Sequence, residues 1–191
     1  MSTIYTLNGK VLKNSANDKW LIKAPPPEEV TIGTQIWKTK NLAIDDGQGG
    51  IYTQTVNYGQ GNVTEYYYTW DAAVRVAASI SGWHLASNDE WTALANAIGG
   101  ASTGGKKLKS TYGWTSGNGT NDYGFTVLPT GYRLNGEFRN FGTGANFWTA
   151  TSQSSTQAAG WYFGTYDSMS SSLAYNKTNY NLCVRLIKDS E

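Results

Sequence analysis

Two short runs of alternating apolar and polar residues open the chain, at residues 4–7 and 10–13, and Asn8-Gly9 lies between them. Asn-Gly favours a type I′ turn because both residues tolerate a positive φ, so the pattern predicts a β-hairpin. A third short strand is predicted at residues 19–23. Three strands of this size are hardly stable alone. We therefore expect residues 1–24 to assemble with another protein or another copy of the chain, or else to pair with the main sheet.

Two helices are predicted in the middle of the chain. Residues 72–78 are rich in alanine, and Asp71 precedes them near the expected N-cap. The second helix begins with a capping box, in which the Ser87 hydroxyl and the Glu90 carboxylate each pair with a free backbone N–H. Helical spacing of apolar residues and a terminal glycine pair complete it: Trp91, Leu94, Ala95 and Ile98, followed by Gly99-Gly100.

Short apolar runs alternate with turn residues beyond Gly113, which is typical of small antiparallel sheets. A second hairpin turn of the Asn-Gly type lies at Asn135-Gly136. The predicted fold class is therefore α+β, with two helices against a small, loop-rich antiparallel sheet. The apolar runs are at residues 124–128, 131–134, 147–150, 160–163 and 182–187.

A run of prolines divides the chain. Pro25-Pro26-Pro27 and the two glutamates after them have the composition of a stiff, extended spacer. We predict an N-terminal hairpin segment for attachment or oligomerisation at residues 1–24, a linker at 25–29 and the main domain at 30–191.

Charge and composition exclude several classes of protein. The 15 Lys and Arg residues nearly balance 14 Asp and Glu, so the chain has no basic surface for nucleic acid or an anionic membrane. No apolar run has the length of a signal peptide or a membrane span. The single cysteine, Cys183, excludes an intrachain disulfide, so we expect folding in a reducing cytoplasm. The 13 Tyr, 8 Trp and 22 Gly residues favour aromatic, loop-rich surfaces.

A series of short motifs in a fixed order carries a family resemblance. Over residues 30–189 these motifs resemble the Fibrobacter succinogenes major paralogous domain, a branch of the C-type-lectin-like fold. The resemblance implies that fold here, with Trp83, Trp91 and Trp148 as core residues. In chain order the motifs are Gln35-Ile36-Trp37, Asn41-Leu42, Tyr68-Thr69-Trp70, Ala72-Ala73, Ser81-Gly82-Trp83-His84-Leu85, Asp89-Glu90-Trp91-Thr92-Ala93-Leu94, Leu108-Lys109-Ser110, Asn121-Asp122-Tyr123-Gly124-Phe125, Leu128-Pro129-Thr130-Gly131-Tyr132-Arg133, Phe147-Trp148-Thr149-Ala150-Thr151 and Val184-Arg185.

Two departures from the family pattern occur together. The family usually carries one cysteine before its Gly-Trp-His motif and another after its Val-Arg, whereas this chain has Ser79 and Leu186 in those places. Their joint absence is expected if the two form one disulfide that a protein of a reducing compartment does not use. Ala86 replaces a common proline, and we attach no function to it.

Side chains suited to catalysis or metal binding are few. A hydrolase needs a nucleophile with a base and an orienting acid, or paired carboxylates. The single histidine, His84, lies in an apolar motif where we expect a hydrogen-bonded core residue, and Asp45-Asp46 fit a solvated turn. Calcium-dependent lectins carry Glu-Pro-Asn and Trp-Asn-Asp signatures that are absent here, and formylglycine-generating enzymes need reactive cysteines, whereas Cys183 lies in an apolar strand. We expect no catalytic residue, metal or cofactor.

Residues 152–181 differ in composition from the rest of the chain. They hold seven Ser, four Tyr, three Asn and three Thr, with only Asp167 and Lys177 charged, which is typical of a paratope. Because the alternation is broken, we expect exposed loop or edge strand, with Met169 and the aromatic residues at the surface. The predicted ligand-binding residues are Trp161, Tyr162, Phe163, Thr165, Tyr166, Asp167, Ser168, Ser170, Ser172, Tyr175, Asn176, Thr178, Asn179 and Tyr180.

In the lectin-like fold this segment resembles the variable region of proteins diversified by retroelements, whose mutagenesis acts at adenines. An Asn codon altered at its adenines gives chiefly Asn, Ser, Thr, Tyr, Asp, Gly, Ala, Phe, Leu and similar residues, and never Lys, Glu, Gln, Met or Trp. Between Tyr162 and Tyr180 only Met169 and Lys177 fall outside that set, so we expect these two to be fixed. The alternative is a polar, low-complexity loop without such a history.

The resemblance implies a non-catalytic receptor-binding protein of a bacteriophage tail, with residues 161–180 as the ligand-binding face. Its partner would be a cell-surface protein or glycan, and residues 1–24 would contact tail proteins or another copy. Such a chain is made in the bacterial cytoplasm and carried on the virion. The alternative is a bacterial surface adhesin or carbohydrate-binding module whose leader was removed, and a formylglycine-generating type of enzyme is a third interpretation.

Overall fold

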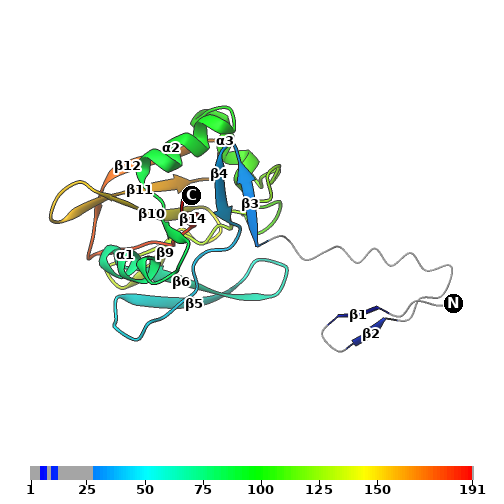
Figure 1. Ribbon diagram of the computed structural model, residues 1–191, viewed down its shortest axis with the longest axis horizontal. Coiled ribbons are helices and arrows are strands. Elements are labelled where there is room, and N and C mark those ends of the chain that lie inside the picture. Colours follow the sequence, from blue (N-terminus) through cyan, green and yellow to red (C-terminus); the bar gives the residue numbers. More distant parts are fainter. Residues whose placement is uncertain (1–4, 8–9, 13–27, 191) are drawn as a thin grey trace.

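The computed structural model describes residues 5–7, 10–12 and 28–190, which form an α+β structure of short helices and small antiparallel sheets (Figure 1). At the N-terminal end β1 (Tyr5–Leu7) pairs with β2 (Lys10–Leu12), which confirms the predicted hairpin. The Asn8-Gly9 turn, the strand predicted at residues 19–23 and the prolines of the predicted linker lie outside the described residues.

Four further sheets build the rest of the described chain. The central sheet has the strand order β10-β11-β12, and a four-stranded sheet has the order β3-β4-β14-β7. Glu29, the last residue of the predicted linker, already belongs to β3 and pairs with Lys38. The strand bounds are β3 (Glu29–Ile32), β4 (Gln35–Lys38), β5 (Ile51–Asn57), β6 (Asn62–Tyr68), β7 (Trp83–Leu85), β8 (Tyr132–Leu134), β9 (Glu137–Arg139), β10 (Ala145–Ser152), β11 (Gln157–Phe163), β12 (Met169–Asn176), β13 (Tyr180–Asn181) and β14 (Leu186–Lys188).

The described residues hold three helices, one more than the sequence predicts: α1 (Trp70–Ala78), α2 (Asn88–Ala97) and α3 (Ala101–Leu108). The Ser87–Glu90 capping box of α2 is confirmed. The N-cap of α1 is Thr69, whose hydroxyl accepts from the Ala72 N–H, while Asp71 lies in the first turn, so the expected cap is off by two residues.

The unpredicted helix α3 contains two adjacent glycines, which have poor helix propensity. Both glycines are buried at close contacts. A Cβ at Gly104 would meet the Ile98 side chain, and a Cβ at Gly105 would overlap the Ser168 carbonyl. Tertiary packing therefore places a helix where local propensity argues against one.

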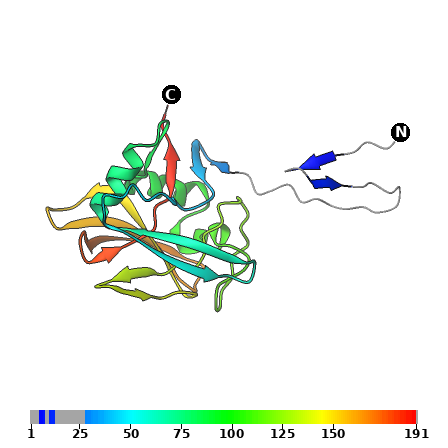
Figure 2. The same cartoon turned by 90° about the horizontal axis from the view of Figure 1, so that it is seen from below.

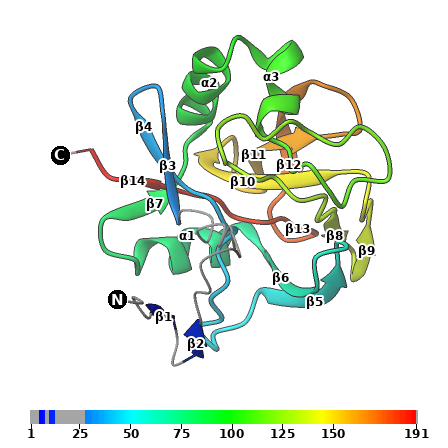
Figure 3. The ribbon, with the colours of Figure 1, turned by 90° about the vertical axis from the view of Figure 1, so that its right-hand side faces the viewer.

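Helices cover both faces of the central sheet (Figures 1 and 3). On one face α2 contacts β10 and β11, and α3 contacts β12. On the other face α1 contacts β10. The hairpin β5–β6 lies on the same side as α1 and crosses the front of the domain when it is viewed from below (Figure 2).

The apolar core between α2 and the central sheet is built around Trp91. Its ring centroid lies 5.0 Å from that of Trp37, 5.5 Å from that of Phe147 and 6.0 Å from that of Trp161, which is stacked on it. Because Trp91 and Trp148 are fully buried, their predicted core position is confirmed. Trp83 packs against the second apolar cluster but is only half-buried, with the Lys38 ammonium 4.0 Å from its ring centroid, so its predicted core position is confirmed only in part.

A buried polar network joins the start of the domain to its last strands. The Arg185 guanidinium donates to Asn41 Oδ1 at 2.8 Å and to the carbonyls of Lys38 and Phe125. Asn41 in turn donates to the buried Glu65 carboxylate at 3.0 Å, so its amide lies between the two charged groups. Burial raises the pKa of Glu65, although the bonds from Asn41 and Tyr58 oppose the shift. Buried charges need such partners, since their loss of hydration is otherwise uncompensated.

Candidate ligand-binding face

The regular alternation of β11 separates the predicted site residues onto two faces. Trp161 and Phe163 point to the core and are 4% and 0% exposed, and Met169, opposite Phe163 on β12, is 2% exposed. The expected exposure of these three residues is therefore wrong. The Trp161 Nε1–H donates to Asn88 Oδ1 at 3.0 Å, which fixes the indole against α2. Tyr162, between Trp161 and Phe163, points to the opposite face because side chains alternate along a strand.

Four half-buried tyrosines gather on that opposite face: Tyr132 of β8, Tyr162 of β11, Tyr175 of β12 and Tyr180 of β13. We call these four residues the tyrosine face. Tyr132 and Tyr180 are stacked with ring centroids 5.7 Å apart, and Tyr175 meets Tyr180 edge-on at 5.1 Å. Sequence reasoning missed Tyr132, because it lies outside the tyrosine-rich segment and reaches the cluster only through the pairing of β8 with β13.

Glycines let the tyrosine rings lie close to the backbone. A Cβ at Gly144 would come within 3.1 Å of the Tyr162 ring, and one at Gly164 within 2.7 Å of the Tyr162 hydroxyl. A Cβ at Gly160 would come within 3.0 Å of the Tyr175 ring. The positions of Tyr162 and Tyr175 therefore depend on glycine at these three points.

Neutral hydrogen-bonding groups characterise the tyrosine face. Asn146, buried on β10, donates from Nδ2 to the Tyr175 hydroxyl at 2.8 Å, and its Oδ1 has no partner among the described residues. Burial, reinforced by Tyr180 and opposed by the bond from Asn146, raises the pKa of Tyr175 to about 12. Burial and the neighbouring Tyr132 and Tyr166 also raise the pKa of Tyr162. These tyrosines are therefore uncharged hydrogen-bonding groups at neutral pH.

The loop between β11 and β12, residues 164–168, extends this surface. Tyr166 is 80% exposed, and Thr165, Asp167 and Ser168 lie beside it. Gly164 of the loop lies against Tyr162, since a Cβ there would come within 2.7 Å of the Tyr162 hydroxyl, so the loop borders the tyrosine face. The structure thus brings together the predicted residues of the loop and the tyrosines of the sheet.

The remaining predicted residues lie on β12 or in the turn after it. Ser170 is exposed and Ser172 half-buried on that strand. In the turn to β13, Asn176 Oδ1 accepts from the backbone N–H groups of Thr178 and Asn179, which fixes the turn. Because β12 is an edge strand of the central sheet and Ser170 lies opposite Tyr162, Ser170 lies at the margin of the tyrosine face.

Lys177, within the same turn, is buried although it is charged. Its ammonium donates to Ser152 Oγ at 2.7 Å and to the Ser154 carbonyl at 2.8 Å. It also lies 4.0 Å from the ring centroid of Trp70. Lys177 therefore anchors the turn to the end of β10 and to α1, and it presents little surface to a ligand.

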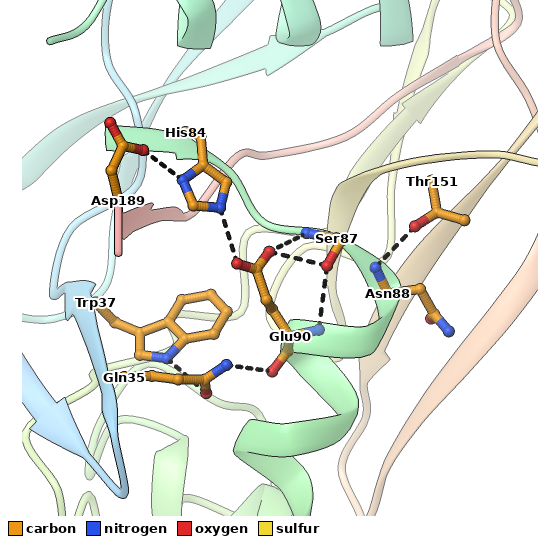
Figure 4. Close-up of polar contacts among 8 residues, drawn as sticks. All are labelled: Gln35, Trp37, His84, Ser87, Asn88, Glu90, Thr151 and Asp189. Carbon is orange, nitrogen blue, oxygen red and sulfur yellow. Dashed lines mark hydrogen bonds and ion pairs between the residues drawn. The ribbon is translucent and has the colours of Figure 1, made fainter. Parts of the chain in front are cut away.

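His84 joins three elements away from this face (Figure 4). Its Nδ1 lies 2.7 Å from Asp189 Oδ1 beyond β14, and its Nε2 lies 2.8 Å from Glu90 Oε1 on α2. The other oxygen of Glu90 accepts from the Ser87 N–H, so Glu90 caps the helix and binds the imidazole. The predicted hydrogen bonding of His84 is confirmed, but its side chain is 39% exposed and lies outside the core.

This contact makes a pH-dependent contribution to stability. Burial lowers the pKa of His84, but the bonds to Glu90 and Asp189 outweigh burial and raise the pKa above the ordinary 6.5. The contact therefore stabilises the fold fully below pH 6.5, and this stabilisation is lost as the pH rises through the raised pKa. Burial raises the pKa of Glu90, but its bonds to Ser87 and His84 lower it below 4.5, so that stabilisation is lost as pH falls through the lowered value.

We therefore expect His84→Gln to destabilise the domain most between pH 4.5 and 6.5. Since the pair is partly exposed, the loss is on the order of 0.5 kcal/mol after solvent screening. Urea unfolding of both proteins at about pH 5.5 and about pH 9 measures the difference. An equal loss at both pH values would contradict the expectation.

The thiol of Cys183 is enclosed. Cys183 is fully buried, and burial raises the pKa of its thiol, which disfavours the reactive thiolate. No group of three or more His, Cys, Asp or Glu side chains in the described part of the chain is arranged to hold a metal ion. Among the described helices, none has the length and apolar character needed to cross a bilayer.

Comparison with known proteins gives one result. The family model described as the Fibrobacter succinogenes major domain matches residues 30–188. No curated protein and no solved structure matches the chain.

Proposed function

The chain belongs to the Fibrobacter succinogenes major domain family over residues 30–188, and from this premise we propose that it is a non-catalytic receptor-binding protein with a C-type-lectin-like scaffold. Its binding face is the tyrosine face together with the loop of residues 164–168. The side chains of this face that lie between Tyr162 and Tyr180 are diversified by a retroelement, whereas Tyr132 belongs to the constant scaffold. The buried Cys183 thiol and the imidazole of His84 between two carboxylates support a role without catalysis.

The proposal rests on a match between residue type and burial in the segment from Tyr162 to Tyr180. Between Tyr162 and Tyr180, the side chains that are exposed or half-exposed are all of types that an Asn codon altered at adenines encodes. The two types that it cannot encode are Met169 and Lys177, which are 2% and 9% exposed. Both support the scaffold, Met169 in the core and Lys177 through its bonds to Ser152 and Ser154. The burial of Lys177, a charged residue, is the less ordinary part of this pattern, since lysine is rarely buried without a structural role.

The chemistry of the face also supports binding. Tyrosine combines a large, stiff apolar ring with a hydroxyl, so it gives contact area at low entropic cost. The one exposed charge of the predicted set, Asp167, lies 3.4 Å from the Lys106 ammonium, so the face carries little net charge. A neutral, tyrosine- and serine-rich face fits a cell-surface protein or glycan through hydrogen bonds and ring contacts rather than through ion pairs.

The proposed setting is the tail of a bacteriophage. Residues 1–24 attach the domain to tail proteins or to other copies, and several copies on one particle strengthen weak binding at each site. The pairing of residues 5–7 with residues 10–12 is compatible with such an attachment role.

Sequencing this gene across a natural population tests the proposal. We expect amino-acid substitutions to concentrate at the codons of exposed residues between Tyr162 and Tyr180, at positions that are adenines in a nearby near-repeat. Codons for Met169 and Lys177 stay constant, and residues 30–110 serve as the internal control. Uniform variation along the gene, or frequent change at Met169 or Lys177, would remove the diversified face from the proposal.

A further inference from the structure

The loop of residues 164–168 is held in place almost entirely by contacts that other residues make to its main-chain atoms. Among the described residues, no hydrogen bond to the side chain of Thr165, Tyr166 or Ser168 is found, and Asp167 makes only the 3.4 Å contact with Lys106 on the surface. Tyr166 nevertheless stands out at 80% exposure. The contacts that fix the loop must therefore come from the residues beneath it.

Lys109, which follows α3, supplies most of these contacts. Its ammonium donates to the carbonyls of Gly164 at 3.0 Å and Tyr166 at 2.8 Å, and to that of Gly117 at 2.6 Å. An ammonium has three N–H donors, so these three carbonyls satisfy it completely. The residue is fully buried, with its ammonium 4.7 Å from the ring centroid of Trp114, so solvent cannot replace a lost partner without opening the site.

Backbone contacts from two neighbouring segments complete the support. The Lys106 N–H of α3 donates to the Asp167 carbonyl at 2.9 Å. Gly105 and Gly117 approach the loop so closely that a Cβ on either would overlap the carbonyl of Ser168 or Thr165. Every one of these contacts is made to a main-chain atom of the loop, which is present whichever side chains stand at residues 165–168.

We propose that Lys109 is a positioning residue of the binding face, which fixes the main chain of the loop so that residues 165–168 are preordered for the ligand whatever their identity. Preordering reduces the entropy lost on binding, and it lets side chains change without loss of the loop conformation. That the loop contacts a ligand rests on the proposed function, whereas its fixing by Lys109 is testable without any ligand.

Limited digestion with chymotrypsin tests the fixing of the loop. Although Tyr166 is exposed, the protease needs local unfolding around the cleaved bond, so we expect the Tyr166–Asp167 bond of the native protein to resist cleavage. Lys109→Met keeps the length and apolar stem but removes the three ammonium bonds. We expect cleavage at this bond, identified by mass spectrometry, to become about tenfold faster or more, since cleavage follows the population of the open loop.

Lys107→Met is the matched control. Lys107, on α3, also donates from its ammonium to a carbonyl, that of Ile98 at 2.7 Å, but this contact is made to the end of α2 and not to the loop. Its cleavage rate at Tyr166 should stay at the wild-type value. Tyr166→Ala should abolish the cut and so confirm its position. Rapid cleavage of the wild type at Tyr166, or a folded Lys109→Met as resistant as Lys107→Met, would overturn the proposal.

If circular dichroism shows that Lys109→Met does not fold, a second pair of variants tests whether the loop is fixed from beneath. Gly105→Ala pushes on the Ser168 carbonyl and should accelerate the same cut, whereas Gly104→Ala meets the Ile98 side chain and should not. Equal resistance of these two variants would show that the loop conformation does not depend on the residues beneath it, and this would overturn the proposal. The digestion and the population sequencing can give different answers. If the native loop resists cleavage but the gene shows no variation in the population, the diversified face is refuted while the role of Lys109 stands.

Discussion

Trp91→Ala is expected to destabilise the domain more than any other single substitution that we propose. The indole of Trp91 is fully buried and contacts the rings of Trp37, Phe147 and Trp161, so its removal leaves a cavity in the centre of the larger apolar cluster. Truncation of a large core aromatic costs about 3–5 kcal/mol. Since a domain of this size has a total stability of about 5–15 kcal/mol, the loss removes from about a fifth of that stability to all of it.

Urea unfolding followed by far-ultraviolet circular dichroism measures this loss. Trp91→Phe is the control, because it keeps an aromatic ring and removes the indole N–H, which has no hydrogen-bond partner among the described residues. We expect the phenylalanine variant to lose less than half as much free energy of unfolding as the alanine variant. A cooperative transition of Trp91→Ala within about 1 kcal/mol of the wild type would contradict the central place of this residue.

Arg185→Met is expected to have the second largest effect. The variant removes five donors that serve Asn41 and the carbonyls of Lys38, Phe125 and Thr126, and it removes the buried positive charge that attracts the Glu65 carboxylate across Asn41. Burial lowers the pKa of Arg185 to about 10, yet the guanidinium still carries its charge at neutral pH. Removal of one member of a buried charged pair costs about 3–5 kcal/mol.

A double-mutant cycle separates the charge from the packing. Glu65→Gln keeps a polar group of the same size between Asn41 and Tyr58. If the uncompensated carboxylate causes much of the loss, the double variant with Arg185→Met is more stable than Arg185→Met alone in urea unfolding. Strict additivity of the two changes would show that the charges do not interact and that the lost carbonyl partners alone account for the effect.

Local rules predicted the elements that local chemistry controls. The capping box of α2 and the hairpin at Asn135-Gly136, where both residues have a positive φ, follow from side chains a few positions apart. Helix α3 was missed because Gly104 and Gly105 oppose a helix locally and are held there by Ile98 and Ser168. No local rule contains that packing.

The difference between local chemistry and tertiary packing also explains which parts of the candidate site could be predicted from the sequence. Composition identified the segment that carries the exposed residues, but it could not show that the alternation of β11 turns Trp161 and Phe163 inward. Tyr132 and Lys109 were missed because they lie far from that segment in sequence. Likewise, His84 and Asp189 are 105 positions apart, so no spacing indicates their contact.

The enclosed position of Cys183 has a practical consequence. The only thiol of the chain is buried and keeps its proton, so it reacts poorly with maleimides in the native state. A cysteine placed at the exposed Ser170 would therefore be the one thiol that a fluorophore or a surface attaches to. The natural scaffold is in this way ready for single-site labelling, with its own cysteine left in place.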